Sequence, residues 1–512
     1  MRSTFLGLET ARKGLSASQK GLDITGHNIS NVNTDGYTRQ RVDFVSVSNE
    51  GHPYRTNDGK ISQAGQGVQM QGVSQIRDKF LDKRYRDEYA NTSYYETAKN
   101  ILTALQDSFD EVSSENLNAK FEALLESLQN WSNNPNEEIY ASIVKSATSN
   151  VNQTIKQFHK QLTDVADQQI YDTQVLVNST NTCLQKIVDI NRAILLENTN
   201  ELNEMYTSNE LQDSRNLLLD ELAGYGDINV TYETDGTTTV TMNGHTVIDG
   251  TWCESINLYT YNDKTIGMKW QSTGDNIILE SGSLRANMDY VNGNTGDVRG
   301  IQYYLGVMDG FANKFAEIMN TSIKEYVYDE TGKQIYVKPD GTETTTPDLA
   351  NGDVPKTQFK TLIAPDDGGD VIMAGNINIA KEWNANPGYA ITDVQTDGVE
   401  GNLVTTDILR LINNLSSSVK IGSYEGTLTD FITTYNTDVG TDIVYMGSRY
   451  DASDIITTDL ANRRDAVSGV SLDEEGANLM MFEKAYNAVA RVMTAMDEAL
   501  DKLINGTGLV GR

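Results

Sequence analysis

Residues 479–503, LMMFEKAYNAVARVMTAMDEALDKL, carry an unbroken heptad repeat close to the C-terminus of the chain. Apolar side chains recur seven residues apart in two rows, and the second row follows the first by three residues. The rows are Leu479, Tyr486, Met493 and Leu500, and Phe482, Val489, Met496 and Leu503. This pattern predicts an amphipathic helix whose narrow apolar stripe packs against another helix.

The N-terminal stretch carries a thinner repeat with the same period. Within a helix predicted over residues 4–32, Leu8, Leu15, Leu22 and Ile29 lie seven residues apart. Neither terminal helix can bury its stripe alone, so the pattern predicts a seam between the two helices or between copies of the chain. The interior of the sequence then lies outside the seam, which is typical of a subunit that polymerises through its ends.

The composition of the 512-residue chain indicates a large, acidic, globular protein. Hydrophobic residues make up 38% and charged residues 22%, and the formal net charge is −31. Nucleic acid and anionic membranes are therefore not expected as main partners, because phosphate binding needs clustered lysine and arginine. Residues 1–90 hold 13 Lys+Arg and 10 Asp+Glu, so the remainder of the chain carries the whole acidic excess. This imbalance fits a packed end on a solvated body, or chance variation.

No signal peptide or membrane span is expected. Glu9, Arg12 and Lys13 interrupt the apolar residues at the start of the chain, whereas a signal peptide needs a continuous apolar core. No apolar run approaches the roughly 18 residues of a spanning helix. We therefore expect a cytoplasmic chain, or one exported by a route without a cleaved signal.

The middle of the chain alternates between helical and strand-like patterns. Residues 38–76 are expected to be irregular and extended, and a helix is expected to begin near Ile76. Residues 97–221 are predicted to be almost entirely helical, with a break at Pro135. From 226 to 285, alternating residues flank turns at Asp235-Gly236 and Asn243-Gly244, which predict β-hairpins. Helical pattern returns over 286–325 and again from Thr406 to Ile504.

These patterns predict an α+β multidomain fold with inner domains nested inside outer ones. A terminal coiled-coil assembly domain comprises residues 1–95 and 465–512. A long helical-bundle domain comprises residues 96–225 with 286–325 and 405–464. A β-domain insertion spans 226–285, and a loop-rich mixed insertion spans 326–404, where five of the seven prolines lie.

Catalytic and metal-binding motifs are not evident in the sequence. None of the four histidines is followed by glutamate, and no nucleophile elbow or Walker loop occurs. Ser142 and Lys145 match an SxxK spacing, but the companion motifs are missing and a helical repeat surrounds them. Cys183 and Cys253 fit neither a disulfide framework nor a metal site, and the sequence leaves their redox state open. We expect no enzyme, cofactor or metal.

Three motifs resemble one known family, the bacterial flagellar rod, hook and hook-associated proteins. The first spans residues 28–37, NISNVNTDGY, and resembles the N-terminal signature of that family. The second comprises Gly65 and Gly67 and, further along the chain, residues 76–81, IRDKFL. The third spans residues 468–475, SGVSLDEE, ahead of the final heptads. The residues to which the resemblance assigns assembly are the apolar rows above, with Asn28, Asn31, Asn33, Thr34, Gly36 and Tyr37, and with Gly65, Gly67, Ile76, Arg77, Phe80 and Leu81.

The continuation of the first motif, residues 37–41, YTRQR, resembles the hook-associated branch that forms the first junction layer between hook and filament. The resemblance implies an extracellular structural subunit whose terminal helices form a coiled-coil tube around an export channel. It implies as partners further copies of the chain, hook protein, the second hook–filament junction protein, a cytoplasmic export chaperone and the flagellar type III export apparatus. The subunit number is not implied.

Two kinds of alternative remain open at the level of sequence. The chain could be another flagellar axial protein, such as hook protein or the second junction protein, although residues 37–41 argue against this. It could also be a hydrolase displayed on the flagellum, with its chemistry in residues 226–404, or an adhesin that uses the same insertions. A hydrolase lacks a convincing motif, whereas a binding surface requires none.

Overall fold

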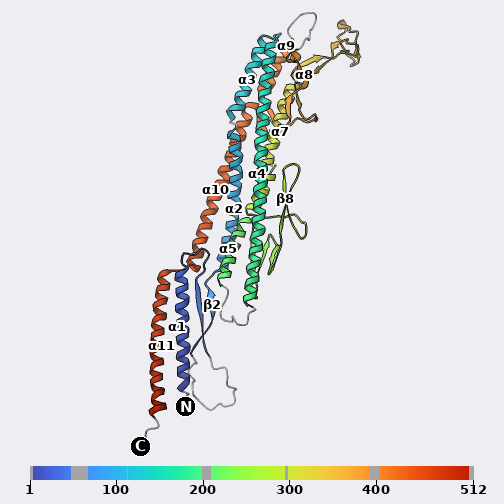
Figure 1. Cartoon of the computed structure of the whole chain (residues 1–512). Coiled ribbons are helices and arrows are strands. Elements are labelled where there is room, and N and C mark those ends of the chain that lie inside the picture. The colour runs from blue at the N-terminus through green and yellow to red at the C-terminus, as the bar shows by residue number, and fades with distance from the viewer. Residues whose placement is uncertain are drawn as a thin grey trace, which may run out of the picture.

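The computed structural model describes residues 4–47, 67–111, 114–135, 137–198, 209–294, 298–391 and 403–506. The molecule is elongated, and its longest helices run along its length (Figure 1). Both chain ends lie at one end of the rod, and the loop-rich segment between residues 324 and 360 lies at the other. No helix in the described ranges is both long and apolar enough to cross a membrane.

The terminal helices predicted from the heptads are present. Helix α1 spans Thr4–Ser30 and helix α11 spans Leu472–Gly506. They lie side by side and run in opposite directions (Figure 1). Their apolar stripes are narrow, so each helix depends on its neighbour for burial.

The prediction of irregular chain over 38–76 was wrong for the described part of that range. Strand β1 (Gln40–Ser46) pairs with strand β2 (Val68–Gln75) in an antiparallel ribbon that lies against α1. A bulge between Asp43 and Phe44 shifts the register of this ribbon. The second helix, α2 (Lys79–Glu111), begins three residues later than expected because Asp78 caps it, accepting a hydrogen bond of 2.9 Å from the backbone N–H of Phe80.

The body of the rod consists of long helices. Helices α3 (Ser114–Asn133) and α4 (Glu138–Asn198) are separated at Pro135, as predicted, and α5 (Asn209–Tyr225) packs against α4 and α2. Helix α10 (Leu428–Ser468) packs along α2. The second and the second-to-last long helices of the chain therefore lie together, just as α1 and α11 do.

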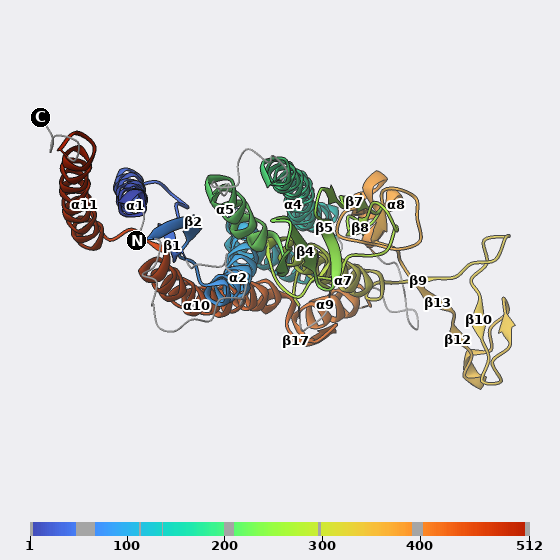
Figure 2. The ribbon, with the colours of Figure 1, turned by 90° about the horizontal axis from the view of Figure 1, so that it is seen from below.

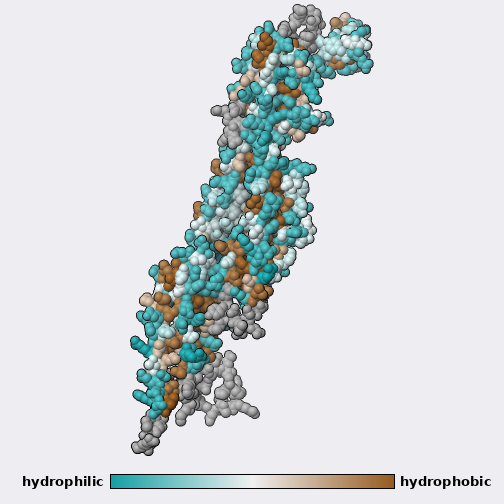
Figure 3. Space-filling model, viewed as in Figure 1, coloured by the Kyte–Doolittle hydropathy of each residue, from teal (hydrophilic) through white to brown (hydrophobic). Residues whose placement is uncertain are grey.

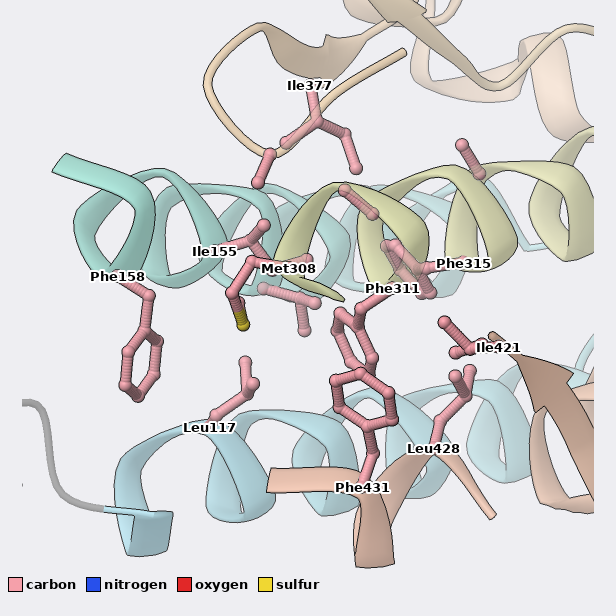
Figure 4. Close-up of a cluster of buried hydrophobic side chains, with 14 of the residues drawn as sticks. Leu117, Ile155, Phe158, Met308, Phe311, Phe315, Ile377, Ile421, Leu428 and Phe431 are labelled. Carbon is pink, nitrogen blue, oxygen red and sulfur yellow. The ribbon is translucent and has the colours of Figure 1, made fainter. Parts of the chain in front are cut away.

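A large apolar cluster lies between these helices, in the part of the body that is farther from the chain termini. Phe121, Phe311, Phe315 and Phe431 are almost fully buried, and their rings contact one another edge-on or tilted. Figure 4 shows Phe311, Phe315 and Phe431 pointing toward one another from α7 (Ile301–Asn320) and α10. Helix α9 (Leu403–Ser416) and a short ribbon of β16 (Val419–Ile421) and β17 (Tyr424–Gly426) close this core. The ribbon was not foreseen.

The β-hairpins predicted for residues 226–285 are confirmed. Strands β3 to β6 form one sheet, with Asp235-Gly236 and Asn243-Gly244 at its turns. Strands β7 and β8 pair separately, and α6 (Ser283–Asn292) follows them. A second apolar cluster joins these strands to α4, α5 and α6. The strands are β3 (Ile228–Tyr232), β4 (Thr238–Met242), β5 (His245–Asp249), β6 (Trp252–Cys253), β7 (Ile256–Thr260) and β8 (Ile266–Trp270).

In the described part of the segment between α7 and α9, up to residue 391, the elements are all short. Its outermost sheet, β11–β10–β12, projects away from the helical body (Figure 2). The strands are β9 (Lys324–Tyr326), β10 (Tyr336–Val337), β11 (Glu343–Thr344), β12 (Val354–Pro355), β13 (Thr357–Phe359), β14 (Ile363–Pro365) and β15 (Ile377–Ile379). The helical turns are η2 (Leu349–Asn351), α8 (Lys381–Ala385) and η3 (Pro387–Ala390).

The two cysteines are free thiols on different elements. Cys183 is buried in α4, and burial raises the pKa of its thiol to about 12. Cys253 lies in β6 and is half-buried. Among the described residues, no group of three or more His, Cys, Asp or Glu side chains is arranged to hold a metal ion.

Candidate assembly interface

The seam between α1 and α11 is built on a row of glycines. A Cβ atom placed on Gly21 would lie 2.6 Å from the ring of Phe482, and one placed on Gly7 would lie 2.3 Å from the end of Met496. Gly14 faces Val489 at 3.4 Å. These three glycines lie seven residues apart, so α11 packs one heptad row, Phe482, Val489 and Met496, directly against the α1 backbone. This row was not predicted from the sequence, although each of its glycines directly precedes one of Leu8, Leu15 and Leu22.

The predicted apolar row of α1 lies beside this contact. Leu8, Leu15, Leu22 and Ile29 are all half-buried. The residues of α1 that are buried include Ala11, Ser18, Thr25 and Asn28, which are small or polar. The closest approach of the two helices therefore depends on small side chains in α1 and large ones in α11.

The apolar heptads of α11 are not fully covered within one chain. Leu479 is 38% exposed and Leu503 is 50% exposed. The other six heptad residues, Phe482, Tyr486, Val489, Met493, Met496 and Leu500, are half-buried. Figure 3 shows hydrophobic surface at the end of the rod where α1 and α11 lie. A helix that leaves this much apolar surface uncovered is suited to further packing.

The signature turn is organised by the buried side chain of Asn28. Its amide nitrogen donates to the backbone oxygen of Gln40 at 2.9 Å, and its amide oxygen accepts from the backbone N–H of Gln40 at 3.0 Å. The hydroxyl of Tyr37 donates to the same amide oxygen at 2.8 Å. Asn28 thus joins the last turn of α1 to the first residue of β1.

The phenol of Tyr37 is held in its protonated, donating form. Burial, together with the negative charges of Asp213, Glu210 and Glu475, raises its pKa well above the usual range. His27 lies against the same hydroxyl at 3.0 Å, and the two rings meet edge-on. The hydroxyl therefore stays protonated at neutral pH and can donate to Asn28.

The same turn is tied to the start of α11. The guanidinium of Arg39 binds Glu475 at 2.7 Å and Glu474 at 2.5 Å. The Glu475 side chain is only 2% exposed and also accepts from the amide of Asn28 at 3.3 Å. The backbone N–H of Arg39 donates to the oxygen of Ser468 at 2.9 Å, where α10 ends. The first and third motifs are therefore in direct contact.

The remaining residues of the first motif shape the turn itself. The amide of Asn31 donates to the backbone oxygen of His27 at 3.0 Å, and the hydroxyl of Thr34 donates to Asn31 at 3.1 Å. Asn33 is exposed. Gly36 has a φ of +77°, in the left-handed region that favours glycine.

The second motif is only partly brought into this site. Gly65 lies outside the described residues. Gly67 has a φ of +95°, and a Cβ there would lie 3.2 Å from the side chain of Thr10 in α1. Ile76 donates its N–H to the oxygen of Arg39 at 2.9 Å. Gly67 and Ile76 thus bracket the second strand where it returns past α1.

Arg77 lies at the joint, the region where the terminal helices and their strands meet the body of the rod, whereas Phe80 does not. The guanidinium of Arg77 binds both oxygens of Asp82, at 2.6 and 3.0 Å, and the hydroxyl of Thr38 at 3.2 Å. The Asp82 side chain is 1% exposed. Phe80 is 66% exposed, and Leu81 is half-buried in the first turn of α2.

The terminal unit, comprising α1, β1, β2 and α11, is attached to the body through polar contacts. The carboxylate of Asp213 in α5 accepts from the backbone N–H of Thr38 at 3.1 Å and from the amide of Gln75 at 2.8 Å. Burial raises the pKa of Asp213, and these hydrogen bonds oppose that rise. Neither of the two apolar clusters in the described residues includes a residue of the terminal unit.

A charge cluster on the body side of the joint was also missed. Asp220 in α5 binds Arg86 of α2 at 2.7 Å and Arg464 of α10 at 2.5 Å. Arg464 also lies over the ring of Tyr85 at 4.1 Å. Helices distant in sequence are thus fixed together on the body side of the elbow between α10 and α11. A lone acidic residue within a helical pattern gives no sequence signal for such a cluster.

Replacing Gly36 with valine is expected to impair assembly while the body stays folded. A β-branched residue in the left-handed region costs about 1–3 kcal/mol, and here the strain falls on the turn that leads from α1 to β1 and contacts the start of α11. Electron microscopy of cells carrying Gly36→Val measures assembly, and circular dichroism of the purified variant measures folding. Gly332 has a similar φ of +79° in an exposed turn of the insertion, so Gly332→Val is the control. Normal assembly with Gly36→Val would contradict the assembly role of this turn.

Comparisons with known proteins identify the family. Family models match residues 8–38 (flagella basal body rod protein), 102–336 (flagellar hook-associated protein FlgK helical domain) and 465–506 (flagellar basal body rod FlgEFG protein C-terminal). Flagellar hook-associated protein 1 of Bacillus subtilis is 30% identical to the chain, and the alignment covers all of both proteins. The Escherichia coli protein of the same name is 22% identical over 97% of this chain and 99% of its own length.

A solved structure has the same fold. The flagellar hook junction protein FlgK from Burkholderia pseudomallei matches with a TM-score of 0.53 at 11% identity, covering 75% of this chain and all of that chain. The full-length relationship to the Bacillus subtilis protein, together with the three family matches in the order expected, settles the membership. The chain belongs to the flagellar hook-associated protein 1 family.

Proposed function

We propose that this chain is a structural subunit of the bacterial flagellum that forms the junction layer between hook and filament. Membership of the hook-associated protein 1 family supports this role. The observation that carries the mechanism is the α1–α11 seam, in which large side chains of one terminal helix pack on a glycine row of the other. The signature turn joins α1 to β1 and to the start of α11, and Thr38 beside it contacts Asp213 of the body.

The assembly step in this proposal is the packing of terminal helix pairs from neighbouring copies into a coiled-coil layer. The incomplete burial of both α11 heptad rows supports it, because each copy still has apolar surface to cover. The elongated body then surrounds this layer, and the inserted segments 226–285 and 326–404 face solvent. We retain the four nested domains, with the boundaries given above, as part of the proposal.

Hook protein below and the second hook–filament junction protein above are the further partners that we propose. Before export, a cytoplasmic chaperone would cover the C-terminal heptads, because an exposed apolar stripe promotes aggregation. The flagellar type III apparatus would then deliver the chain to the extracellular flagellum. The relatives are named as structural flagellar proteins, so we propose no catalytic activity.

Deletion of the gene tests the proposed function. Cells without the protein are expected to make bare hooks and to release flagellin into the medium, since the filament has no layer on which to start. Electron microscopy and an immunoblot of the medium measure the two effects, and a plasmid copy of the gene is the control. Intact filaments would refute the junction role, and missing hooks would reassign the chain to the rod or hook.

A further inference from the structure

A groove of about 780 Å³ lies between the terminal unit and the body. Residues of β1 and β2 form one wall, and residues of α5 with the turn between β3 and β4 form the other. Figure 2 shows the β1–β2 ribbon and α5 next to each other. The groove is therefore bounded by both parts of the molecule.

The guanidinium of Arg215, which lines this groove, has no acidic partner among the described residues. The residue is only 2% exposed. Its Nη1 donates to the side-chain oxygen of Asn191 at 2.9 Å and to the backbone oxygen of Gly236 at 2.7 Å. Its Nε is buried and has no hydrogen-bond partner within the described ranges. A buried charge whose N–H groups are not all paired is costly, so an acceptor on the Nε side would be stabilising.

The surroundings of Arg215 leave it charged and uncompensated. Burial lowers its pKa to about 10, and the nearby charge of Arg86 acts in the same direction. The guanidinium therefore remains protonated at neutral pH. Buried arginines are ordinarily paired with a carboxylate, and here both acceptors on Nη1 are neutral groups.

Lys79 adds a second positive charge to the same groove. Its Nζ lies 4.3 Å from the centre of the Tyr232 ring, and Cζ of Arg215 lies 5.9 Å from that centre. Lys79 is exposed, and no carboxylate in the described part of the chain forms an ion pair with it. One tyrosine ring thus brings two cations without ion-pair partners to one site.

The acidic residues of the groove do not balance these two charges. Asp43 is already paired with Arg41 at 3.2 Å. Glu233 is exposed and accepts a hydrogen bond of 3.1 Å from the hydroxyl of Thr239. The groove therefore keeps an excess of positive charge, although the chain as a whole has a formal net charge of −31.

We infer that this groove binds the carboxylate of a small organic acid. The Nε side of a guanidinium presents two N–H groups in the flat geometry that the two oxygens of a carboxylate accept. Lys79 attracts the same anion, or the second carboxylate of a dicarboxylate. A phosphate dianion is less favourable because Glu233 lines the same groove. Since the walls come from the terminal unit and from the body, the bound acid contacts both.

Titration of the purified full-length chain with succinate tests the site. Hydrogen exchange in β2 and α5 is expected to slow saturably as succinate is added at constant ionic strength, because the bound acid holds the two walls together. Acetate is expected to act in the same way at higher concentrations, and chloride to have no such effect. No saturable change with succinate, the same change with chloride, or tighter binding of phosphate than of succinate would overturn the inference.

Two lysine variants make the test specific. Lys79→Gln is expected to weaken succinate binding about five-fold, through the loss of one nearby charge. Lys120 is exposed on α3, far from the groove in sequence and absent from its lining, so Lys120→Gln is the matched control and is expected to bind as the native chain does. Equal binding by the two variants would overturn the site.

Arg215→Gln is expected to abolish succinate binding while its circular dichroism stays native. Native binding by a folded Arg215→Gln would also overturn the inference. If this variant does not fold, Lys79→Gln still decides, because Lys79 is exposed. All these measurements use the purified chain, so a negative result leaves the proposed junction role intact.

Discussion

Cells that carry Gly21→Leu in place of the native residue are expected to have bare hooks. A Cβ at this position already lies 2.6 Å from the Phe482 ring, and the ring of Phe44 lies beside that ring, with 6.3 Å between the centroids. Phe44 limits the movement of the Phe482 ring, so the larger side chain is expected to push α1 from α11. Overpacking of this kind costs about 1–3 kcal/mol, and a terminal pair that shares no apolar cluster with the body has little else to hold it. Electron microscopy of hooks and a motility assay measure the effect.

Two further variants separate packing from folding at this site. Gly26 lies in the same helix with nothing within 4 Å of a Cβ, so Gly26→Ala is expected to stabilise α1 by up to about 1 kcal/mol through helix propensity. Gly21→Ala gains the same propensity and is nevertheless expected to weaken the seam. Adding Phe482→Ala to Gly21→Leu makes room for the leucine and is expected to restore filaments in part. Normal filaments with Gly21→Leu alone would exclude the glycine row as the point of closest contact.

The glycine row shows where sequence reasoning about the seam stops. Apolar periodicity finds Leu8, Leu15 and Leu22 because their side chains carry the hydrophobic signal. Close contact between helices instead depends on absent side chains, and glycine gives no such signal even at a seven-residue spacing. The large residues of α11 were found because they supply the bulk that fills the space. The heptads therefore predict that the two helices meet, and the structure shows that the closest contact is at the glycine row of α1.

The elements that were missed share a physical cause. Strands β1 and β2 are separated by 21 residues, from Val47 to Gly67, so no tight-turn residues mark them as a hairpin. Strands β16 and β17 have three residues each, too few for an alternating pattern, and only Gly422 with its φ of +60° signals the turn. Hairpins with Asp-Gly or Asn-Gly turns were found because the turn chemistry is local. Strands that pair across a long connection have no comparable turn residues in the local sequence.

The polar joint was also beyond the sequence. Arg39 and Glu475 are 436 residues apart, and Arg464 and Asp220 are 244 residues apart. Each belongs to a motif or helix that could be recognised, but nothing in either segment indicates the partner. The joint matters mechanically because the terminal unit meets the body through polar contacts, such as those of Asp213 with Thr38 and Gln75, rather than through a shared apolar cluster. Its stability should therefore depend on a few charged groups.

Replacing Asp220 with alanine is expected to destabilise the part of the body where α2, α5 and α10 meet by about 3–5 kcal/mol. The Arg86 side chain is only 3% exposed and would be left without its ion-pair partner, and Arg464 would lose its closest one. Burial by itself lowers the pKa of Arg86, but the charges and hydrogen bonds of Asp220 and Tyr232 together raise the pKa above its usual value. Arginine stays protonated without that carboxylate, so the variant must bury an uncompensated charge or open the contact. Urea denaturation followed by hydrogen exchange in α2, α5 and α10 measures the loss.

Asp164→Ala provides the matched control. Asp164 pairs with Lys160 on the surface of α4, where both side chains are more than half exposed, 58% and 74%. Exposed pairs contribute about 0–1 kcal/mol, so this variant should unfold at nearly the native urea concentration. Asp220→Asn keeps a hydrogen-bond acceptor without the charge and should lie between the two. If Asp220→Ala unfolds like Asp164→Ala, this cluster does not hold α2, α5 and α10 together beside the joint.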